Sequence, residues 1–276
     1  MTLSQITANL ASTISVFTNK DRRFRVIVSI VAMIVLQAAF FFAVVWSSVS
    51  IWPQVAASAV VLGDALTKQA QGLPESEIYK LDELLMQDAQ FVEALKVTMI
   101  VLAKLIAFIA ASHIVFIMPC WFFAHNAVRQ TSWKVLFKLF WLALIWITLI
   151  GLTFVLYSIA SGSTQTFLPI TSSNVTTTIM IAALIIITYF AHGTMACADQ
   201  KFKKMFHSCI TNANMLVPAT VVNGLIIFVA GSFGTILFFN NPINPTFPLV
   251  LFIALLFPAL AFTRIHLIWT LWQKQN

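Results

Sequence analysis

Charged side chains are scarce in this sequence, and their scarcity excludes an ordinary soluble domain. Only 9% of the residues are Asp, Glu, Lys or Arg, whereas 60% are hydrophobic. Soluble globular domains carry about 25% charged residues. The apolar runs of roughly 20 residues do not alternate with polar positions, which excludes a transmembrane barrel and favours helices. The sequence therefore predicts an all-α polytopic membrane protein.

Motifs for catalysis and metal binding are also missing. The chain has no P-loop, HExxH or GxSxG motif, and no Asp or Glu falls within an expected span, so no acid and base pair is available for hydrolysis. None of the three cysteines lies in an outer loop, so no structural disulfide is expected. Residues of metal-ligating type near the inner helix ends lack CxxC or HxxxH spacing: Cys120, Cys197, Cys209, His113, His125, His192 and His207. We expect no enzymatic activity, cofactor, metal site or nucleic-acid partner.

Six apolar runs remain, and each is long enough to cross a bilayer as a helix. Pro119 is expected to end or kink the second. The sixth is open to extension toward Trp269 and Trp272, and no expected span carries an Arg in its middle. The expected spans are about Val26 to Trp46, Val97 to Met118, Leu136 to Tyr157, Thr178 to Ala198, Val217 to Phe239, and Phe247 to Phe262.

Basic residues form four clusters that alternate with pairs of these spans. The stretch from Asp64 to Lys96 holds three Lys and seven carboxylates, and residues 158–177 and 240–246 carry no charge. Since Lys and Arg near span ends are retained in the cytoplasm, both termini are expected there. The short loops favour a bacterial inner membrane. The clusters are Lys20, Arg22, Arg23 and Arg25; Arg129, Lys134 and Lys138; Lys201, Lys203 and Lys204; and Arg264 and Lys274.

This topology predicts three helical hairpins, over Lys20 to Cys120, His125 to Cys197, and Lys201 to the last residue. No residue pattern repeats between them, so they reflect either a duplication or only the even number of spans. We divide the chain into residues 1–19 and a six-helix membrane domain, residues 20–276, with an insertion at residues 53–96.

The insertion is expected to be an extracytoplasmic helical hairpin between helices 1 and 2. Gly72-Leu73-Pro74 is a turn signal, and the residues after it place apolar side chains at helical spacing. One helix from about Glu75 to Met118 would continue into the second span, and its partner would run over Val55 to Ala70, continuous with the first. The acidic surface is a candidate protein-binding face, although a solvated face explains it equally well.

Residues 1–19 contain no charged side chain, and we expect them to form an amphipathic helix that lies in the membrane interface on the cytoplasmic side. The alternative is a partly disordered tail. The first apolar run is longer than the core of a signal peptide, so retention as a membrane anchor is expected. Apolar side chains recur at spacings of three and four residues: Leu3, Ile6, Leu10, Ile14 and Phe17.

Polar groups inside a membrane are functional candidates because burying them is costly. Four such residues are substrate or pore candidates: Lys104, His113, His192 and Asn223. Lys104 also fits a side chain that extends to the outer headgroups. A second set is expected to contact anionic lipid headgroups on the cytoplasmic side. It comprises Arg22, Arg23, Arg25, Lys134, Lys138, Lys203 and Lys204.

Two classes of function fit these observations. The first is a non-enzymatic inner-membrane protein with a structural, lipid-associated or envelope-integrity role, because buried charge is so rare. The alternative is a transporter or channel for a small or apolar substrate, with the four polar candidates facing a cavity. The sequence leaves the oligomeric state and the source organism open.

Overall fold

The computed structural model describes residues 3–18, 20–71, 81–167, 171–239 and 246–273, and throughout them the secondary structure is helical, without a strand. Six of the described helical segments are long and apolar enough to cross a membrane. The predicted all-α class and the six apolar helices are thus confirmed. The segments are Arg23–Gln71, Ala89–Val128, Trp133–Tyr157, Val175–Ala196, Ala213–Ala230 and Phe252–Gln273.

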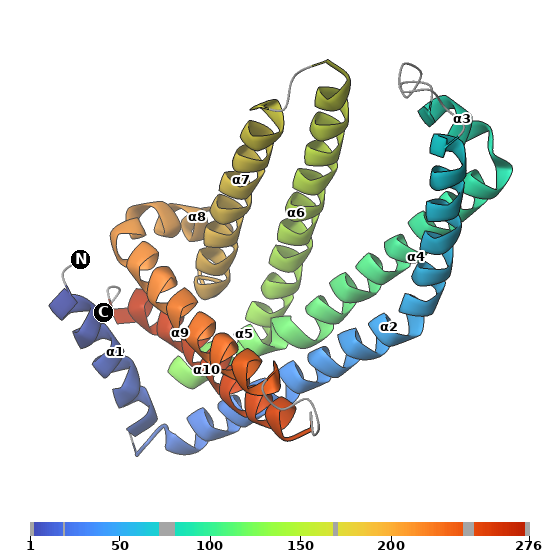
Figure 1. Ribbon diagram of the computed structural model, residues 1–276. Coiled ribbons are helices and arrows are strands. Elements are labelled where there is room, and N and C mark those ends of the chain that lie inside the picture. The colour runs from blue at the N-terminus through green and yellow to red at the C-terminus, as the bar shows by residue number, and fades with distance from the viewer. Residues whose placement is uncertain (1–2, 19, 72–80, 168–170, 240–245, 274–276) are drawn as a thin grey trace. The chain divides into compact units, whose positions relative to one another are not determined.

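The chain divides into two compact units. Unit 1 comprises residues 1–38 and 114–276, and unit 2 comprises residues 39–113. Unit 2 is therefore wider than the expected insertion at residues 53–96, and the expected first hairpin is divided between the units. The helices, labelled in Figure 1, are α1 Leu3–Thr18, α2 Arg23–Gln71, α3 Leu81–Gln87, α4 Ala89–Ser112, the π-helical turn η2 His113–Ile117, α5 Met118–Val128, α6 Trp133–Phe167, α7 Thr171–Ala196, α8 Phe202–Thr211, α9 Ala213–Phe239 and α10 Thr246–Gln273.

Unit 1 is built from pairs of helices. Helices α6 and α7 lie side by side, as do α9 and α10, while α5 packs against both α6 and α10 (Figure 1). The short α8 contacts α7 and α9. Its Lys203 and Lys204 are exposed, whereas Met205 and Cys209 are buried, as expected for an amphipathic helix. Large side chains fill the core: Met33, Met118, Leu139, Leu142, Leu216 and Ile265 are almost completely buried.

Helix α1 confirms the predicted N-terminal helix and packs on α10. The Phe17 and Phe262 rings stack with centroids 6.0 Å apart, and Trp269 Nε1 donates to Ser12 Oγ at 3.1 Å. Thr13 is fully buried, whereas Ile14, part of the expected apolar stripe, is 54% exposed. The face that packs on the protein is therefore partly polar, because Ser12 can satisfy the Trp269 indole there. The interfacial position stays a prediction.

Pro119 does not end the second apolar helix. The helix runs through η2 and α5 as far as Val128, with Pro119 in the first turn of α5. Proline has no N–H and its ring clashes with the carbonyl four residues earlier, so the backbone widens into a π turn ahead of it. The span was predicted to stop near Met118, but the helix continues for ten more residues, from Pro119 to Val128.

Unit 2 contains the remainder of α2, with α3 and α4. The predicted continuity of the first span with the stretch from Val55 to Ala70 is confirmed, because α2 is one helix. The predicted unbroken helix from Glu75 to Met118 is wrong: α3 ends at Gln87 and α4 begins at Ala89. The Asp88 side chain accepts the backbone N–H groups of Gln90 and Phe91, so it caps α4 instead of extending α3. The predicted Gly72-Leu73-Pro74 turn lies outside the described residues.

Helices α6 and α10 also run beyond their expected ends. The uncharged segment 158–177 was expected to be a loop, but α6 reaches Phe167 and α7 begins at Thr171. Helix α10 continues past Phe262 to Gln273. Arg264 therefore lies inside an apolar helix, which corrects the expectation that no span carries an Arg in its middle.

Candidate functional site

The four substrate or pore candidates fall in both units. Lys104 and His113 belong to unit 2, where Lys104 is exposed on α4 and the His113 ring lies edge-on to Phe40, with centroids 6.0 Å apart. His192 and Asn223 belong to unit 1, on α7 and α9. His192 is exposed, whereas Asn223 is buried. Asn223 bonds to residues of α10, whereas the His192 ring lies beside the Trp121 ring of α5, with centroids 5.9 Å apart.

Asn223 joins α9 to α10 through both ends of its amide. Its Nδ2 donates to the Thr263 carbonyl at 3.0 Å, and its Oδ1 lies 2.9 Å from His266 Nδ1. With Nδ1 as the donor, both amide groups of Asn223 are satisfied. The amide thus fastens two helices together. His266 was not predicted, because the expected sixth span ended before it.

A second polar cluster joins α5, α6 and α7. His125 is completely buried on α5, and its Nε2 lies 2.8 Å from the Met195 carbonyl. Trp146 Nε1 on α6 donates to Thr194 Oγ1 at 3.0 Å. Thr194 Oγ1 in turn donates to the Phe190 carbonyl at 2.7 Å. These bonds satisfy polar groups of the core and fix how the three helices pack.

Arg264 is at the centre of a third cluster, which includes residues from α2, α5 and α10. With its amide nitrogen facing the Phe257 carbonyl at 3.0 Å, Gln37 accepts from Arg264 Nη1 through its amide oxygen. The guanidinium carbon lies 5.9 Å from the centroid of the Trp121 ring. The sequence signals for this cluster were Gln37 within the first span and the apolar residues that follow Arg264.

The basic segments of unit 1 meet at one end of its helices. Arg22, just before α2, donates to the Val128 carbonyl at 3.1 Å, at the end of α5. Arg129 forms an ion pair with Asp199, which follows α7. Lys138 on α6 donates to the Gln200 carbonyl at 2.9 Å. These contacts bring together the start of α2, the end of α5, the start of α6 and the end of α7.

The predicted headgroup-contacting residues differ in exposure at this end of unit 1. Arg23, Lys134, Lys203 and Lys204 are exposed, whereas Arg22, Arg25 and Lys138 are half-buried. Arg22 also lies over the Trp272 ring, with 5.8 Å from its guanidinium carbon to the ring centroid, so the end of α10 belongs to the same surface. We call the seven residues the basic end: Arg22, Arg23, Arg25, Lys134, Lys138, Lys203 and Lys204. The exposed cations are free to meet an anionic surface.

All three cysteines are free and buried. Cys197 and Cys209 are neighbours, and a thiol–thiol hydrogen bond with Cys209, together with burial, raises the pKa of Cys197. A protonated, buried thiol is a poor nucleophile and a poor metal ligand. In the described part of the chain, no three His, Cys, Asp or Glu side chains gather in a way that would hold a metal ion.

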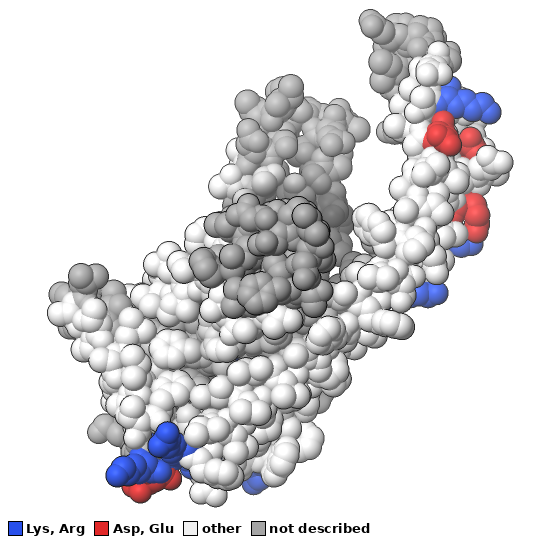
Figure 2. All heavy atoms as spheres, turned by 60° about the horizontal axis from the view of Figure 1, so that its bottom comes forward, with Lys and Arg blue, Asp and Glu red and all other residues white. Residues whose placement is uncertain are grey.

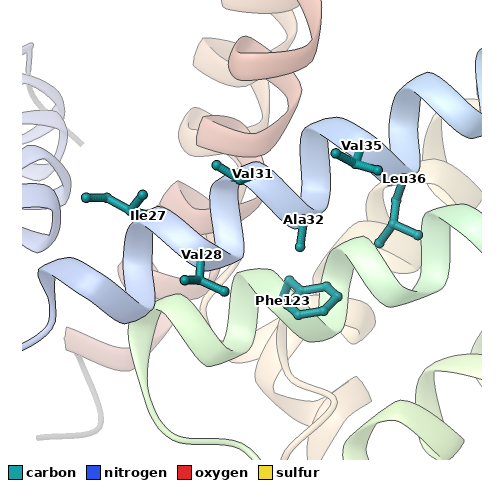
Figure 3. Close-up of a pocket in the computed structure, with 7 residues that line it drawn as sticks. All are labelled: Ile27, Val28, Val31, Ala32, Val35, Leu36 and Phe123. Atoms are coloured by element: carbon teal, nitrogen blue, oxygen red, sulfur yellow. The ribbon is translucent and has the colours of Figure 1, made fainter.

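Two shallow grooves on unit 1 have almost entirely apolar walls. The first, about 510 Å³, lies between α2 and α5 (Figure 3), and the second, about 540 Å³, lies between α7 and α9. Grooves of this kind accommodate hydrocarbon and offer little to a polar solute. The first groove is lined by Ile27, Val28, Val31, Ala32, Val35, Leu36 and Phe123. The second includes Ile181, Leu184, Ile185, Tyr189, Phe190, Val217 and Val221.

Comparison with known proteins finds no family model, no curated protein and no solved structure that matches this chain. Only the arrangement of the side chains therefore bears on what the protein can bind. The described part of unit 1 offers internally bonded polar clusters, apolar grooves, a basic end and one arginine inside an apolar helix.

Proposed function

We propose that the protein is a non-enzymatic, multi-pass protein of the bacterial inner membrane, with a structural, lipid-associated role in the envelope. In this proposal, the basic end of unit 1 faces the cytoplasm with both termini and holds anionic lipid headgroups. The insertion at residues 53–96 lies on the outer side of the membrane, where its acidic surface is available to a protein partner.

The convergence of the basic segments is the observation that carries the proposal. Separate parts of the sequence meet at one end of unit 1 through the bonds of Arg22 to Val128 and of Lys138 to Gln200. Basic residues at span ends are retained in the cytoplasm, and each Lys or Arg near an anionic membrane surface contributes about 1 kcal/mol to lipid attraction. Several exposed cations on one surface therefore favour an anionic leaflet.

The packing of unit 1 favours a structural role and argues against a pathway for polar solutes. The Asn223 amide and His125 Nε2 bond helices to one another. The two grooves described above are apolar, which suits acyl chains of the surrounding lipid. A conduction path for a polar solute needs polar lining groups.

The charges of unit 2 support an aqueous position for part of it. Asp64, Lys68, Glu83, Glu93 and Lys96 are all exposed. Figure 2 shows acidic and basic side chains following one another along these helices, whereas wide areas of the visible face carry no charge. Charged side chains avoid hydrocarbon, so this part of unit 2 suits water or a polar partner.

Lipid retention in native mass spectrometry tests the proposal. The full chain is purified with phosphatidylglycerol and phosphatidylcholine, and we expect preferential retention of phosphatidylglycerol. Neutralising three exposed cations together (Arg23→Gln, Lys203→Gln and Lys204→Gln) should remove most of the preference. The matched control is Lys96→Gln with Lys104→Gln in unit 2. Equal retention of both lipids by the wild-type chain, or the same loss in the control, would contradict the proposal.

The alternative function, a transporter or channel for a small or apolar substrate, draws on Arg264, a half-buried charge within an apolar helix. Labelling separates the two functions. After replacement of the three native cysteines by Ser, single cysteines are placed at positions 104, 113, 192 and 223 and treated with a membrane-impermeant thiol reagent. Protection of all four favours the scaffold, and labelling of positions 192 and 223 favours a water-filled pathway.

A further inference from the structure

Arg264 is a fixed positive charge placed inside an apolar helix. Its side chain is half-buried, and nine residues of α10 follow it, the last being Gln273. At 1.5 Å per residue this is about 13 Å along the helix. If the end of α10 lies at the edge of a hydrocarbon layer about 30 Å thick, the guanidinium is well inside that layer. Arginine stays protonated in proteins, so the charge persists.

The groups around Arg264 are neutral. Its Nη1 donates to the Leu260 carbonyl at 3.2 Å and to the Gln37 amide oxygen, and its guanidinium lies over the Trp121 ring. Among the described residues Arg264 forms no ion pair. The sequence of unit 1 contains only two Asp or Glu side chains, Asp21 and Asp199, and the second pairs with Arg129. Unit 1 therefore holds the charge in place without neutralising it.

A charge in a low-dielectric site needs a counter-charge, because hydrogen bonds to neutral oxygens and an aromatic face recover only part of its hydration energy. Both described hydrogen bonds of Arg264 use Nη1, so Nη2 and Nε have no acceptor among the described residues. Such a guanidinium edge matches the two oxygens of a carboxylate or phosphate. The bonds from Nη1 to Gln37 and to the Leu260 carbonyl hold the guanidinium in place.

We infer that Arg264 binds one oxyanion, a carboxylate or phosphate, carried by an apolar molecule that reaches the site within the membrane. The apolar carrier follows from the position of Arg264, because a free anion would have to shed its water to enter the hydrocarbon layer, whereas an amphiphile brings its anionic group along the apolar helices. Trp121 forms one wall, and the exposed His192 ring lies 5.9 Å from it between centroids. This site shares no residue with the basic end, so it does not depend on the proposed function.

Binding to the full chain in an uncharged maltoside detergent tests the inference. The probes are dodecyl phosphate, dodecylphosphocholine with the same alkyl chain but no net charge, and inorganic phosphate. We expect saturable binding of dodecyl phosphate, seen as a change in tryptophan fluorescence because the cation over Trp121 becomes paired. Arg264→Gln should weaken this binding at least tenfold, roughly the value of a lost hydrogen bond to a charged group. The control Arg23→Gln, at the basic end, should leave it unchanged.

Two aromatic variants keep the test decisive if Arg264→Gln does not fold. Trp121→Phe should abolish the fluorescence change, and Trp146→Phe, which alters a tryptophan bonded to Thr194, should retain it. Equal binding of dodecyl phosphate and dodecylphosphocholine, or wild-type affinity in Arg264→Gln, would overturn the inference. Saturation of the same signal by inorganic phosphate at similar affinity would overturn the apolar carrier and assign a free oxyanion to the site.

Discussion

The two units are both helical, but they use polar side chains differently. In unit 1, polar groups join one helix to another, as in the bonds from Asn223 on α9 to Thr263 on α10 and from Trp146 on α6 to Thr194 on α7. In unit 2, the hydroxyls of Ser48, Ser50 and Thr98 donate to the carbonyl four residues earlier on their own helix. Packing in unit 1 thus depends on particular pairs, whereas these bonds in unit 2 are local and make no demand on a partner helix.

The comparison predicts its largest effect at Asn223. Asn223→Leu leaves the buried His266 Nδ1 without its partner, at a cost of about 1–3 kcal/mol, and also removes the bond to the Thr263 carbonyl. We expect a clear fall in the melting temperature of the purified chain in detergent, measured by intrinsic fluorescence. Ser48→Ala, which removes a local bond in unit 2, is the matched control and should change the unfolding free energy by less than about 0.5 kcal/mol. Equal losses would break the comparison.

A smaller effect is expected where α7 packs against α8. A Cβ added at Gly193 would lie 2.7 Å from Cys209 Sγ, so Gly193→Ala forces this thiol to move. Overpacking of this kind costs about 1–3 kcal/mol, and the lower part of that range applies because a single sulfur atom is displaced. The double variant with Cys209→Ala should recover most of the lost stability in the same melting experiment. Gly151→Ala is the control, because no atom lies within 4 Å of its added Cβ. Failure of the second substitution to rescue the first would show that the contact is not the cause.

The smallest effect is expected at the break between α3 and α4 in unit 2. Asp88→Ala removes the side chain that accepts the N–H groups of Gln90 and Phe91, and the loss of such a cap costs about 1 kcal/mol. We expect faster hydrogen exchange of these two amides, with little change in the global melting temperature. Asp88→Asn, which keeps an accepting oxygen, should preserve the protection. A drop in melting temperature as large as that of Asn223→Leu would show that unit 2 is coupled to the core.

Much of the fold was predictable because the membrane restricts the choices. The apolar composition required helices, and the runs of apolar residues gave their number and approximate places. The continuation of the first span into the stretch from Val55 to Ala70 was also predicted, although Pro53 lies between them. Pro53 and Pro119 did not end their helices, because a proline inside a long helix can be accommodated by a local change such as the π turn before Pro119.

The candidate sites were less predictable than the helices. Asn223 was recognised as a polar group in a span, but hydropathy does not reveal that His266 is its partner, because that pairing depends on how α9 packs against α10. Arg264 was assigned to a basic flank, since one positive charge resembles a span end unless the apolar residues after it are counted. Gln37 gave little signal on its own, and its contact with Arg264 joins residues far apart in the sequence.

The sequence by itself determined that this chain is a helical membrane protein with six apolar helices and clustered basic flanks, because hydrogen-bonding the backbone in hydrocarbon leaves no other choice for runs of this length and composition. Only the tertiary structure decided which basic segments meet, which polar groups bond one another and which charge has no counter-charge among the described residues of unit 1. These outcomes depend on the angles and rotations at which helices pack, and periodicity along a single helix does not encode them.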